Sequence, residues 1–551
     1  MKQHDDFSDY YEDLLEGRYD CPDRIVLNGY FRLGQQGGAF RYWWRCLTGS
    51  DETLDQEHVL QMAGRFSRRV HAYAKRHRIR LIHCEAGVRK HELAEQYRPQ
   101  DPTFTGLFLI LVGKAPALVW EVIKTPRGAP YLQRKTPWPY VNHYHFHIID
   151  KDWGHLTIKM SGHPPFGVQV MLNGHEWVER RARRNAIATV KEGNCFVGGS
   201  DFPAVDRLAD ALCDAHAIGR LSAVCARWVY SSCLCFALDR DEQQRSGFRY
   251  QYSCYQLEYS RNLLFARGTV LDEVYQGLID RTRRTLDVDT LKTIFGRKHR
   301  PHWFRTARRA APRVERVLEE STHDLTVFKL HFDRLTLKLY DKGARVLRIE
   351  VIVHSVKTLR CGKRLEQLSI VLARLQRMVV DFLNVVHAAH LSTLDAGALD
   401  ALPLPTHRGA QRLAGVDVQK PRMRRVMEAV LGLAPKPGGF TARDLADTTQ
   451  ALLSPGEIYT PRQAAYDLRK LRGKELIERV GTSRRVQPKP PGIRTLAALL
   501  ILREKVIKPV LAGAGTPKPG RPPKRIHPLD AHYETLQREL RRTFETLGLA
   551  A

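Results

Sequence analysis

The clearest pattern of hydrophobic and polar positions lies between residues 421 and 490. Apolar residues recur there every three or four positions in three successive segments, which predicts three helices. Thr441 and Thr460 precede the second and third segments, and threonine is a favoured N-cap residue. Two short segments follow that are expected to form a strand and its return strand, with Gly481 in the turn between them. The predicted elements are a helix starting at residue 421, helices 442–453 and 461–473, and strands 476–480 and 484–486.

This order of elements is typical of a winged helix, whose third helix enters the major groove of DNA and whose hairpin meets the backbone or the minor groove. A winged helix that contacts another protein is the alternative. The side chains expected to meet the groove are Arg462, Gln463, Tyr466, Arg469 and Lys470. Those expected to meet phosphates or the minor groove are Arg484 and Arg485.

The pattern upstream of residue 421 mixes both periods. A helical period covers 54–78 and again 363–390, where a long amphipathic helix is expected. Continuous apolar segments at 106–112 and 117–123 predict two partner strands in the centre of a sheet. Strict alternation predicts three antiparallel strands. These strands are expected at 325–330, 334–340 and 345–354, and a strand, turn and strand are expected at 25–45.

The fold class predicted from these patterns is α+β and multidomain. A mixed-sheet N-terminal and central body carries packed helices, and a winged helix-turn-helix follows at the C-terminus. A chain of 551 residues has room for about three or four domains. The expected regions are an N-terminal α/β region (1–139), a histidine-rich hairpin with helices (140–260), a basic loop with an antiparallel sheet and the long helix (261–400), a linker (401–415), the winged helix (416–512) and a basic tail with a terminal helix (513–551).

The net charge of +29 is the most informative feature of the composition. Such a charge attracts polyanions without specifying which one. Residues 406–551 contain 28 Lys and Arg against 13 Asp and Glu, so about half of the excess surrounds the predicted winged helix. This location favours nucleic acid as the partner, and DNA before RNA.

Other features of the composition bear on the location of the chain. No apolar run reaches the roughly 18 residues that a membrane span needs. The first nineteen residues are acidic and polar, unlike a signal peptide. The ten cysteines show no regular spacing and are expected to be reduced. The expectation is a cytoplasmic protein without membrane contact, in which the long helix serves as core or as the seam of a homodimer.

Six histidines between residues 140 and 184 are the main candidates for chemistry. His143, His145 and His147 alternate with apolar residues, so a strand would place all three imidazoles on one face. The next predicted strand begins at His155, and a hairpin would bring this histidine and Lys159 to the same face. We expect a divalent metal, Mn²⁺, Mg²⁺ or Zn²⁺, to be bound by His143, His145, His147 and His155. A polar sheet face that stacks on a neighbour or lies along nucleic acid is the alternative.

The segment His145-Phe146-His147-Ile148 resembles the metal-binding pair of the HUH endonucleases, which include rolling-circle replication initiators and relaxases. In that family a tyrosine attacks a phosphate that the metal polarises. Tyr255 and Tyr259, one helical turn apart if their segment is helical, resemble the paired tyrosines of that family and are the candidate nucleophiles. The resemblance implies a nuclease or a replication enzyme.

The basic tail is a further candidate for nucleic-acid contact. Residues 518–525 resemble an AT-hook, whose Gly-Arg-Pro core lies in the narrow groove of A·T tracts. Proline stands at position 519, where the motif usually has arginine, and a flexible basic linker is the alternative. The cations concerned are Lys518, Arg521, Lys524 and Arg525.

The chain also has two wider resemblances to known proteins. Segments that include 140–144, 161–166, 173–176 and 258–262 resemble an uncharacterised bacterial protein family over most of the chain, which implies a bacterial origin and no particular chemistry. The C-terminal module resembles winged-helix regulators of the MarR type over about seventy residues.

Three functions follow from these observations. The first is a bacterial nucleic-acid-binding protein of regulatory or mobile-element context, docked through its winged helix. The second is a metal-dependent nuclease that uses the histidines and a tyrosine. The third is a scaffold whose winged helix binds protein.

Overall fold

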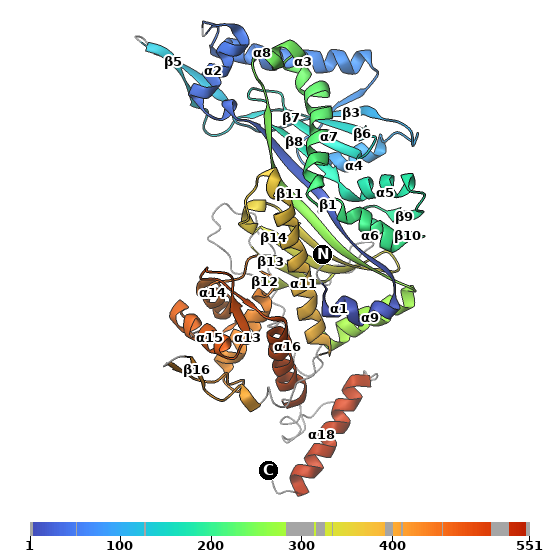
Figure 1. Cartoon of the computed structure of the whole chain (residues 1–551), viewed down its shortest axis with the longest axis vertical. Coiled ribbons are helices and arrows are strands. Elements are labelled where there is room, and N and C mark those ends of the chain that lie inside the picture. The colour runs from blue at the N-terminus through green and yellow to red at the C-terminus, as the bar shows by residue number, and fades with distance from the viewer. Residues whose placement is uncertain are drawn as a thin grey trace. The chain divides into compact units, whose positions relative to one another are not determined.

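A computed structural model describes residues 4–50, 52–125, 128–282, 313–315, 326–332, 334–391, 400–408, 411–454, 456–507 and 528–546 (Figure 1). The chain divides into two compact units. The central unit comprises Glu16–Leu264 and Ile352–Ala373, and the C-terminal unit comprises Met1–Leu15, Phe265–Val351 and Arg374–Ala551. The predicted regions were consecutive in sequence, whereas each unit combines separated segments.

A mixed sheet forms the framework of the central unit, with strands in the order β11-β1-β8-β7-β6-β3-β2. The pairs β1–β8, β8–β7, β7–β6 and β6–β3 are antiparallel, and β2–β3 is parallel. The strands are β1 (Leu15–Phe31), β2 (Arg80–His83), β3 (Gly106–Pro116), β6 (Tyr140–Asp150), β7 (Gly154–Ser161), β8 (Val168–Asn173) and β11 (Tyr250–Phe265). Two further hairpins are β4 (Trp120–Thr125) with β5 (Gly128–Arg134) and β9 (Thr189–Glu192) with β10 (Cys195–Gly199).

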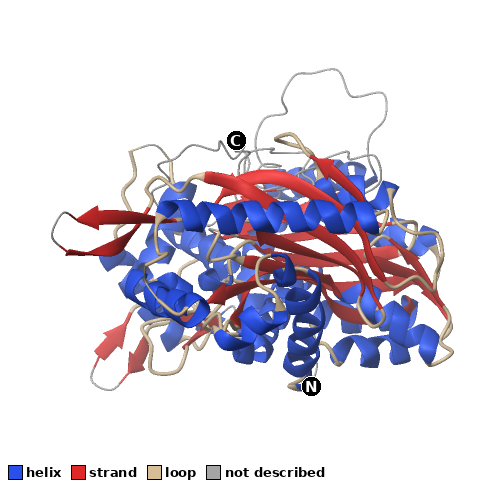
Figure 2. Cartoon of the chain, turned by 90° about the horizontal axis from the view of Figure 1, so that it is seen from above, coloured by secondary structure: helices blue, strands red, loops and turns tan. Residues whose placement is uncertain are grey.

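Helices pack along these strands (Figure 2). They are α2 (Gly37–Thr48), α3 (Gln56–Arg76), α4 (Lys90–Gln96), α5 (Gly174–Arg184), α6 (Phe202–Asp210), α7 (His216–Ser232) and α8 (Arg240–Arg245), with the short helices η2 (Leu33–Gln35), η3 (Leu234–Phe236), η4 (Val356–Leu359) and η5 (Leu365–Gln367). The long helix α11 (Leu368–Leu391) begins in this unit.

The alternating residues of β6 separate two faces of the sheet. On one face, Tyr144 contacts Phe66 of α3 and Phe146 stacks on Phe236 of η3, with ring centroids 5.0 Å and 5.8 Å apart. On the histidine side, Ala94 of α4 packs on Leu109 and Leu111 of β3 in a small apolar cluster. The period of two in β6 therefore gives one aromatic core face and one largely polar face, as the sequence predicts.

Three predictions for the central unit are wrong. Residues 37–48 form the helix α2 instead of a strand, because Phe40, Trp43 and Trp44 bury one helical face. The segment 120–125 pairs with β5 and not with β3. Residues 250–265 form one long strand, so the helical pattern expected over 260–281 is wrong for its first residues and becomes a helix only at Gly268–Thr282.

The C-terminal unit contains four strands in the order β12-β13-β14-β15 and several helices. The strands are β12 (Arg313–Glu315), β13 (Thr326–Phe332), β14 (Leu335–Lys342) and β15 (Val346–Val353), and the last three confirm the predicted antiparallel strands. The helices outside 421–507 are α1 (Asp6–Tyr10), η1 (Glu12–Leu14), α9 (Gly268–Thr282) and α18 (Pro528–Thr546), and a hairpin of β16 (Thr406–Arg408) and β17 (Gln411–Leu413) lies in the expected linker.

The predicted helices and hairpin at 421–490 are all present. They are α13 (Pro421–Leu433), α14 (Ala442–Leu452), α15 (Pro461–Gly473), β18 (Ile477–Arg479) and β19 (Val486–Pro488), followed by α16 (Pro490–Ile501) and the π-helical turn η6 (Leu502–Ile507). Thr441 and Thr460 each form a capping box, with Asp444 and Gln463. Phe440 exchanges two backbone hydrogen bonds with Val486, which ties the start of α14 to the hairpin. In the part of the chain that the structure describes, no helix combines the length and apolarity of a membrane span.

Candidate functional site

A polar face on β6 and β7 brings the predicted histidines together. Residues directly opposite in an antiparallel pair project to the same side of the sheet. The register places His143 opposite Ser161, His145 opposite Lys159, His147 opposite Thr157 and Ile149 opposite His155. We call this surface the histidine face. The prediction that four histidines and Lys159 share one face is confirmed.

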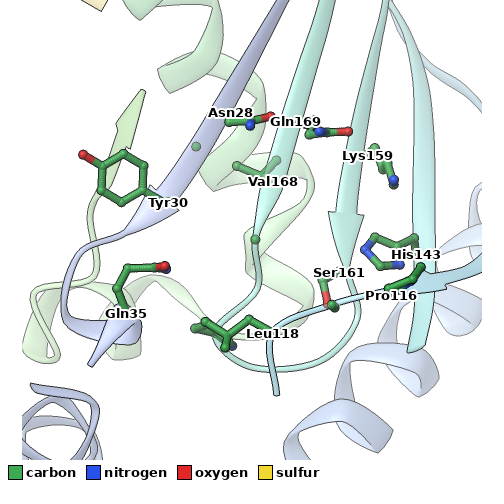
Figure 3. A pocket seen from close by; sticks show the side chains of 14 residues that line it. Asn28, Tyr30, Gln35, Pro116, Leu118, His143, Lys159, Ser161, Val168 and Gln169 are labelled. Atoms are coloured by element: carbon green, nitrogen blue, oxygen red, sulfur yellow. Dashed lines mark hydrogen bonds between the residues drawn. The ribbon is translucent and has the colours of Figure 1, made fainter. Parts of the chain in front are cut away.

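The polar face continues across two more strands. Lys159 lies opposite Gln169 of β8, and Gln169 lies opposite Asn28 of β1. The Gln169 Nε2 donates a hydrogen bond of 2.9 Å to the Asn28 Oδ1. Asn28, Gln169, Lys159 and His145 thus form a cross-strand row, of which Figure 3 shows the first three.

The histidines take part in a hydrogen-bonded chain that leads to helix α4. The His147 Nδ1 lies 3.1 Å from the His155 Nε2, and the His155 Nδ1 lies 3.1 Å from the Glu95 Oε1. Arg98 continues the chain by pairing with both Glu95 and Glu176. Glu176 also pairs with Lys191 at 2.8 Å. The carboxylates on this side of the sheet are therefore already occupied by basic partners.

The surroundings set the protonation of these groups. Burial lowers the pKa of His147 to about 3, and burial together with Lys159 lowers the pKa of His145 to about 3 and of His143 to about 4. The hydrogen bond with His155 is the main reason that the pKa of Glu95 falls to about 2. At neutral pH the three histidines of β6 are uncharged, which is the form that binds metals.

The histidines do not converge on one point. Among the described residues, one group of three or more His, Cys, Asp and Glu side chains has ligand atoms within 4.8 Å of one another, and it consists of Cys21, Asp23 and His175. The metal expected at His143, His145, His147 and His155 therefore has no ready-made three-ligand site. The His147 Nε2 is buried without a hydrogen-bond partner among the described residues.

The two candidate tyrosines lie far from the histidines. Tyr255 and Tyr259 belong to β11, so the expected helical turn between them is absent. Strands β1, β8 and β7 separate β11 from β6, a distance of roughly 19 Å at the usual strand spacing. Tyr259 is fully buried, donates to the Asp20 Oδ2 at 2.9 Å, and has a pKa raised well above its ordinary value by burial. A phenol in this environment is a poor nucleophile.

A cavity opens beside the histidine face. Its volume is about 270 Å³, and it is lined by Asn28, Gly29, Tyr30, Gln35, Pro116, Ala117, Leu118, His143, Lys159, Ser161, Pro165, Gly167, Val168 and Gln169. The polar residues of the cross-strand row form one wall, and prolines, Leu118 and Val168 form much of the rest (Figure 3).

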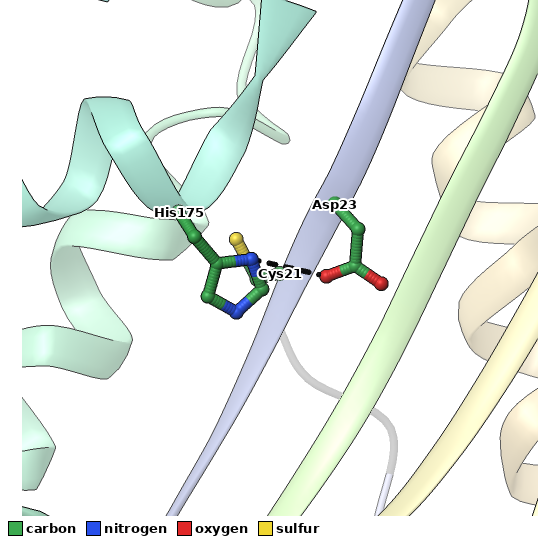
Figure 4. Close-up of side chains that lie close together, drawn as sticks. All are labelled: Cys21, Asp23 and His175. Atoms are coloured by element: carbon green, nitrogen blue, oxygen red, sulfur yellow. Dashed lines mark ion pairs between the residues drawn. The ribbon is translucent and has the colours of Figure 1, made fainter. Parts of the chain in front are cut away.

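A second polar group, which we call the buried cluster, lies where β1 and β11 meet the start of α5. Cys21, Asp23 and His175 belong to it (Figure 4). The His175 Nδ1 lies 3.2 Å from the Asp23 Oδ1, and both side chains are fully buried. Ser260 donates to the same carboxylate at 2.8 Å, and the Tyr19 hydroxyl lies 3.3 Å from the His175 Nε2. A cysteine, an aspartate and a histidine are suitable Zn²⁺ ligands, yet the aspartate and the histidine here already have protein partners.

The same cluster contains a buried ion pair. The Arg261 Nε and Nη2 donate to the two oxygens of Asp20, both at 2.8 Å. Tyr259 donates to the second of these oxygens. This bidentate geometry is the strong form of an arginine–carboxylate pair. The charges of Asp20 and Arg261 therefore compensate each other.

Gly174 allows the buried cluster to form. A Cβ atom at this position would lie 2.0 Å from the carbonyl oxygen of Pro22. The first residue of α5 therefore packs directly on the backbone of β1. This close approach places His175 beside Asp23.

The sequence reasoning missed the buried cluster and the cavity. Their members come from distant positions, such as Asp20 and Arg261, which are 241 residues apart and which a linear pattern does not connect. The available indication was the presence of Asp20, Asp23, Ser260 and Arg261 close to the apolar runs 25–27 and 263–265. Polar residues buried in a strand require partners.

The C-terminal cations differ in how they are placed. Arg462, Arg469 and Arg484 are exposed, on α15 and at the tip of the hairpin. Lys470 is buried, which corrects the prediction that it faces outward, because it pairs with Asp467 at 3.3 Å and lies over the Tyr466 ring. Arg485 is partly buried and donates to the carbonyl oxygen of Gly439.

Two other predicted contacts have separate outcomes. The Gln463 side chain accepts from the Thr460 backbone as part of the capping box. The tail cations Lys518, Arg521, Lys524 and Arg525 lie outside the described residues.

Comparison with known proteins adds no identification, because no family model, no curated protein and no solved structure matches this chain.

Proposed function

We propose that the chain binds nucleic acid and docks on duplex DNA through a winged helix formed by residues 421–501. The observation that carries this proposal is the exposure of Arg462, Arg469 and Arg484 on a frame of three helices and a hairpin. In a winged helix, the third helix and the hairpin are the two elements that meet DNA. The cations thus occupy the two places where such a frame needs them.

The local structure of α15 supports this role. Its N-terminus begins with a capping box and a proline at the first helical position, which fixes the start of the helix. Ala464, Leu468 and Leu471 bury one side in the core of the C-terminal unit. Arg462 and Arg469 remain on the exposed side, seven residues or about two turns apart. Two cations at this spacing follow the edge of a groove.

The electrostatics of the chain agree with a polyanionic partner. Each phosphate that a protein cation neutralises releases counterions, so affinity falls steeply with salt. The affinity of the chain for DNA should therefore depend on salt for two reasons. One is the general attraction of a chain with net charge +29. The other is the set of phosphate contacts that the three exposed arginines make. Local cations can therefore be separated from overall charge by experiment.

The experiment compares two triple variants that lose the same charge. The first replaces Arg462, Arg469 and Arg484 with alanine. The second replaces the exposed central-unit residues Lys151, Arg183 and Arg245 with alanine. Affinity for a DNA duplex is measured by fluorescence anisotropy between 50 and 300 mM NaCl. The salt slope is the steepness with which log affinity falls as log salt concentration rises, and the loss of about three phosphate contacts lowers it by about 2.7.

The first variant is expected to show this reduced slope, and the second to keep a slope close to that of the unmodified chain. Equal slopes for the two variants would contradict docking through the winged helix. An RNA hairpin serves as the second ligand, because the deep and narrow major groove of A-form RNA does not admit a helix. Stronger binding to the hairpin than to the duplex would assign the chain to RNA.

The nuclease alternative retains only half of its geometry. His145 and His147 share a face, whereas Tyr255 and Tyr259 lie four strands away on β11. Labelled single-stranded DNA incubated with the chain and Mn²⁺ tests this alternative directly. A covalent adduct on either tyrosine would restore it.

A further inference from the structure

The ammonium group of Lys159 has no counterion in the part of the chain that the structure describes. Its side chain belongs to the cross-strand row and lines the 270 Å³ cavity. No ion pair joins Lys159 to a carboxylate among the described residues, and the charged group that shifts its pKa is a second cation, Lys90. Burial and Lys90 both lower the pKa of Lys159, which reflects the same lack of compensation.

Lys90 does not relieve this imbalance. Its side chain extends over Gly113, where a Cβ atom would lie 3.0 Å from the Lys90 Cε. Gly113 lies opposite His143 in the pairing of β3 and β6. The nearby carboxylates of Glu95 and Glu176 already pair with Arg98, His155 and Lys191. The cavity is therefore lined by a cation, Lys159, that no carboxylate of the described residues neutralises.

The other polar groups of the cavity have fixed directions. His143 is uncharged and its Nδ1 lies 3.1 Å from the carbonyl oxygen of Val141, so this nitrogen carries the proton and donates. The His143 Nε2 is left as a hydrogen-bond acceptor. The Ser161 hydroxyl is held by the backbone of His163, and the Gln169 amide is held by Asn28. These bonds leave the Asn28 amide nitrogen as a donor.

We propose that this cavity binds a small organic oxyanion, a phosphate monoester or a carboxylate, whose charged oxygens pair with Lys159. A charged group buried without a partner is costly, and an oxyanion supplies the missing charge together with hydrogen-bond acceptors. The acceptor nitrogen of His143 selects a ligand that carries a hydroxyl or N–H group beside the anion.

The size and the remaining walls limit the body of this ligand. The volume lies just below the 300–1,000 Å³ of pockets for drug-sized molecules. Tyr30, Pro116, Leu118 and Pro165 supply aromatic and apolar surface. The ligand is therefore compact, with one flat or apolar part and one anionic end.

Three probes test the proposal and separate its two ligand classes. They are phenyl phosphate, phenylacetate and mandelate, which is phenylacetate with an added hydroxyl. Binding to the full-length chain is measured by isothermal titration calorimetry in 150 mM NaCl, a concentration that screens exposed charges over about 8 Å. Saturable binding with one site is expected for at least one probe, and mandelate is expected to bind more tightly than phenylacetate.

The variant that decides is Lys159→Met, which keeps the length of the side chain and removes its charge. Its matched control is Lys151→Met, because Lys151 is an exposed lysine in the turn of the same hairpin. Lys159→Met is expected to weaken binding by about tenfold or more, the effect of losing one charge-assisted hydrogen bond. Lys151→Met is expected to bind as the unmodified chain does, and circular dichroism checks that both variants are folded.

Two results would overturn the proposal. One is the absence of saturable binding for all three probes to the folded chain. The other is equal affinity in Lys159→Met and Lys151→Met. Tighter binding of phenyl phosphate assigns the site to phosphate monoesters, and tighter binding of the carboxylates assigns it to carboxylic acids. Neither failure affects DNA docking, since the winged-helix variants leave Lys159 unchanged.

Discussion

The central unit contains two polar groups on one sheet, and they differ in their balance of charge. In the buried cluster, Asp20 is matched by Arg261, and Asp23 is matched by His175 and Ser260. On the histidine face, Lys159 and Lys90 have no carboxylate partner among the described residues, and the histidines beside them are uncharged. A balanced group stabilises the fold that contains it, whereas an unbalanced group favours a ligand.

The largest effect is expected from breaking the balanced pair. Arg261→Met leaves the carboxylate of Asp20 buried without its bidentate partner and should lower the free energy of unfolding by about 3–5 kcal/mol. Urea denaturation followed by tryptophan fluorescence measures this, because Trp43, Trp44 and Trp153 are buried in the same unit. Arg245→Met, at an exposed site, is the control. A loss below about 1 kcal/mol would mean that the pair adds little to stability.

Acid should weaken the histidine face next. The pKa of His147 is about 3 in the folded chain, below the ordinary value near 6.5, so the unfolded chain binds its proton first as the pH falls. This contribution to stability is complete above pH 6.5 and is lost progressively as the pH falls towards 3, by about 1.4 kcal/mol per pH unit.

The variant His147→Gln should lower the change in unfolding free energy per pH unit by the amount that one proton contributes. Urea midpoints between pH 7 and pH 4 measure this change. His77→Gln removes an exposed histidine at the C-cap of α3 and serves for comparison. Equal slopes in the two variants would contradict the low pKa of His147.

Removing the unbalanced cation should have the opposite sign to Arg261→Met. Lys159→Met takes away a charge that pairs with no carboxylate of the described residues, so the free energy of unfolding should stay the same or rise by about 1 kcal/mol. The same urea titration measures both variants. If Lys159→Met destabilises the chain by more than this amount, Lys159 holds the fold together and the contrast between the two polar groups fails.

The smallest expected effect applies the same distinction to helix α15. Arg469 is exposed, whereas the neighbouring Lys470 is buried against Asp467. Arg469→Ala should lower the salt slope of DNA binding by about 1, the value for one phosphate contact. Lys470→Ala should leave that slope unchanged. A lower slope for Lys470→Ala would show that this lysine leaves Asp467 on binding.

Sequence patterns could predict the local elements but not their partners. The period of two around His143, His145 and His147 fixed which side chains share a face, because a strand alternates without regard to the rest of the fold. The capping threonines likewise marked the helices of the C-terminal unit. The positions of Lys470 and Arg485 could not be predicted. Arg485 is held by the Gly439 carbonyl, and Lys470 pairs with Asp467 of its own helix, which is buried against Tyr459 and Arg422.

Longer-range features were beyond the reach of periodicity for the same reason. Ser260 and Arg261 lie in the long strand β11, where the sequence pattern placed a helical period, and these two polar side chains face Asp23 and Asp20 across the sheet. The cavity draws its lining from β1, β7, β8 and the segments around residues 116 and 165. The order in which the strands pair determines both the partners of Ser260 and Arg261 and the lining of the cavity. This order cannot be predicted from the periodicity of a single sequence.

The contact of Gly174 with Pro22 has a consequence for mutational scanning. The space for even one methyl group is absent there, so a saturation library screened for folded chains should retain glycine at position 174 and accept many residues at exposed positions of the same helix, such as Arg183. Because the φ angle of Gly174 does not itself require glycine, the loss of folded variants at this position would be due to the lack of space beside strand β1. The arrangement of Cys21, Asp23 and His175 in the interior would therefore depend on the absence of a Cβ atom at position 174.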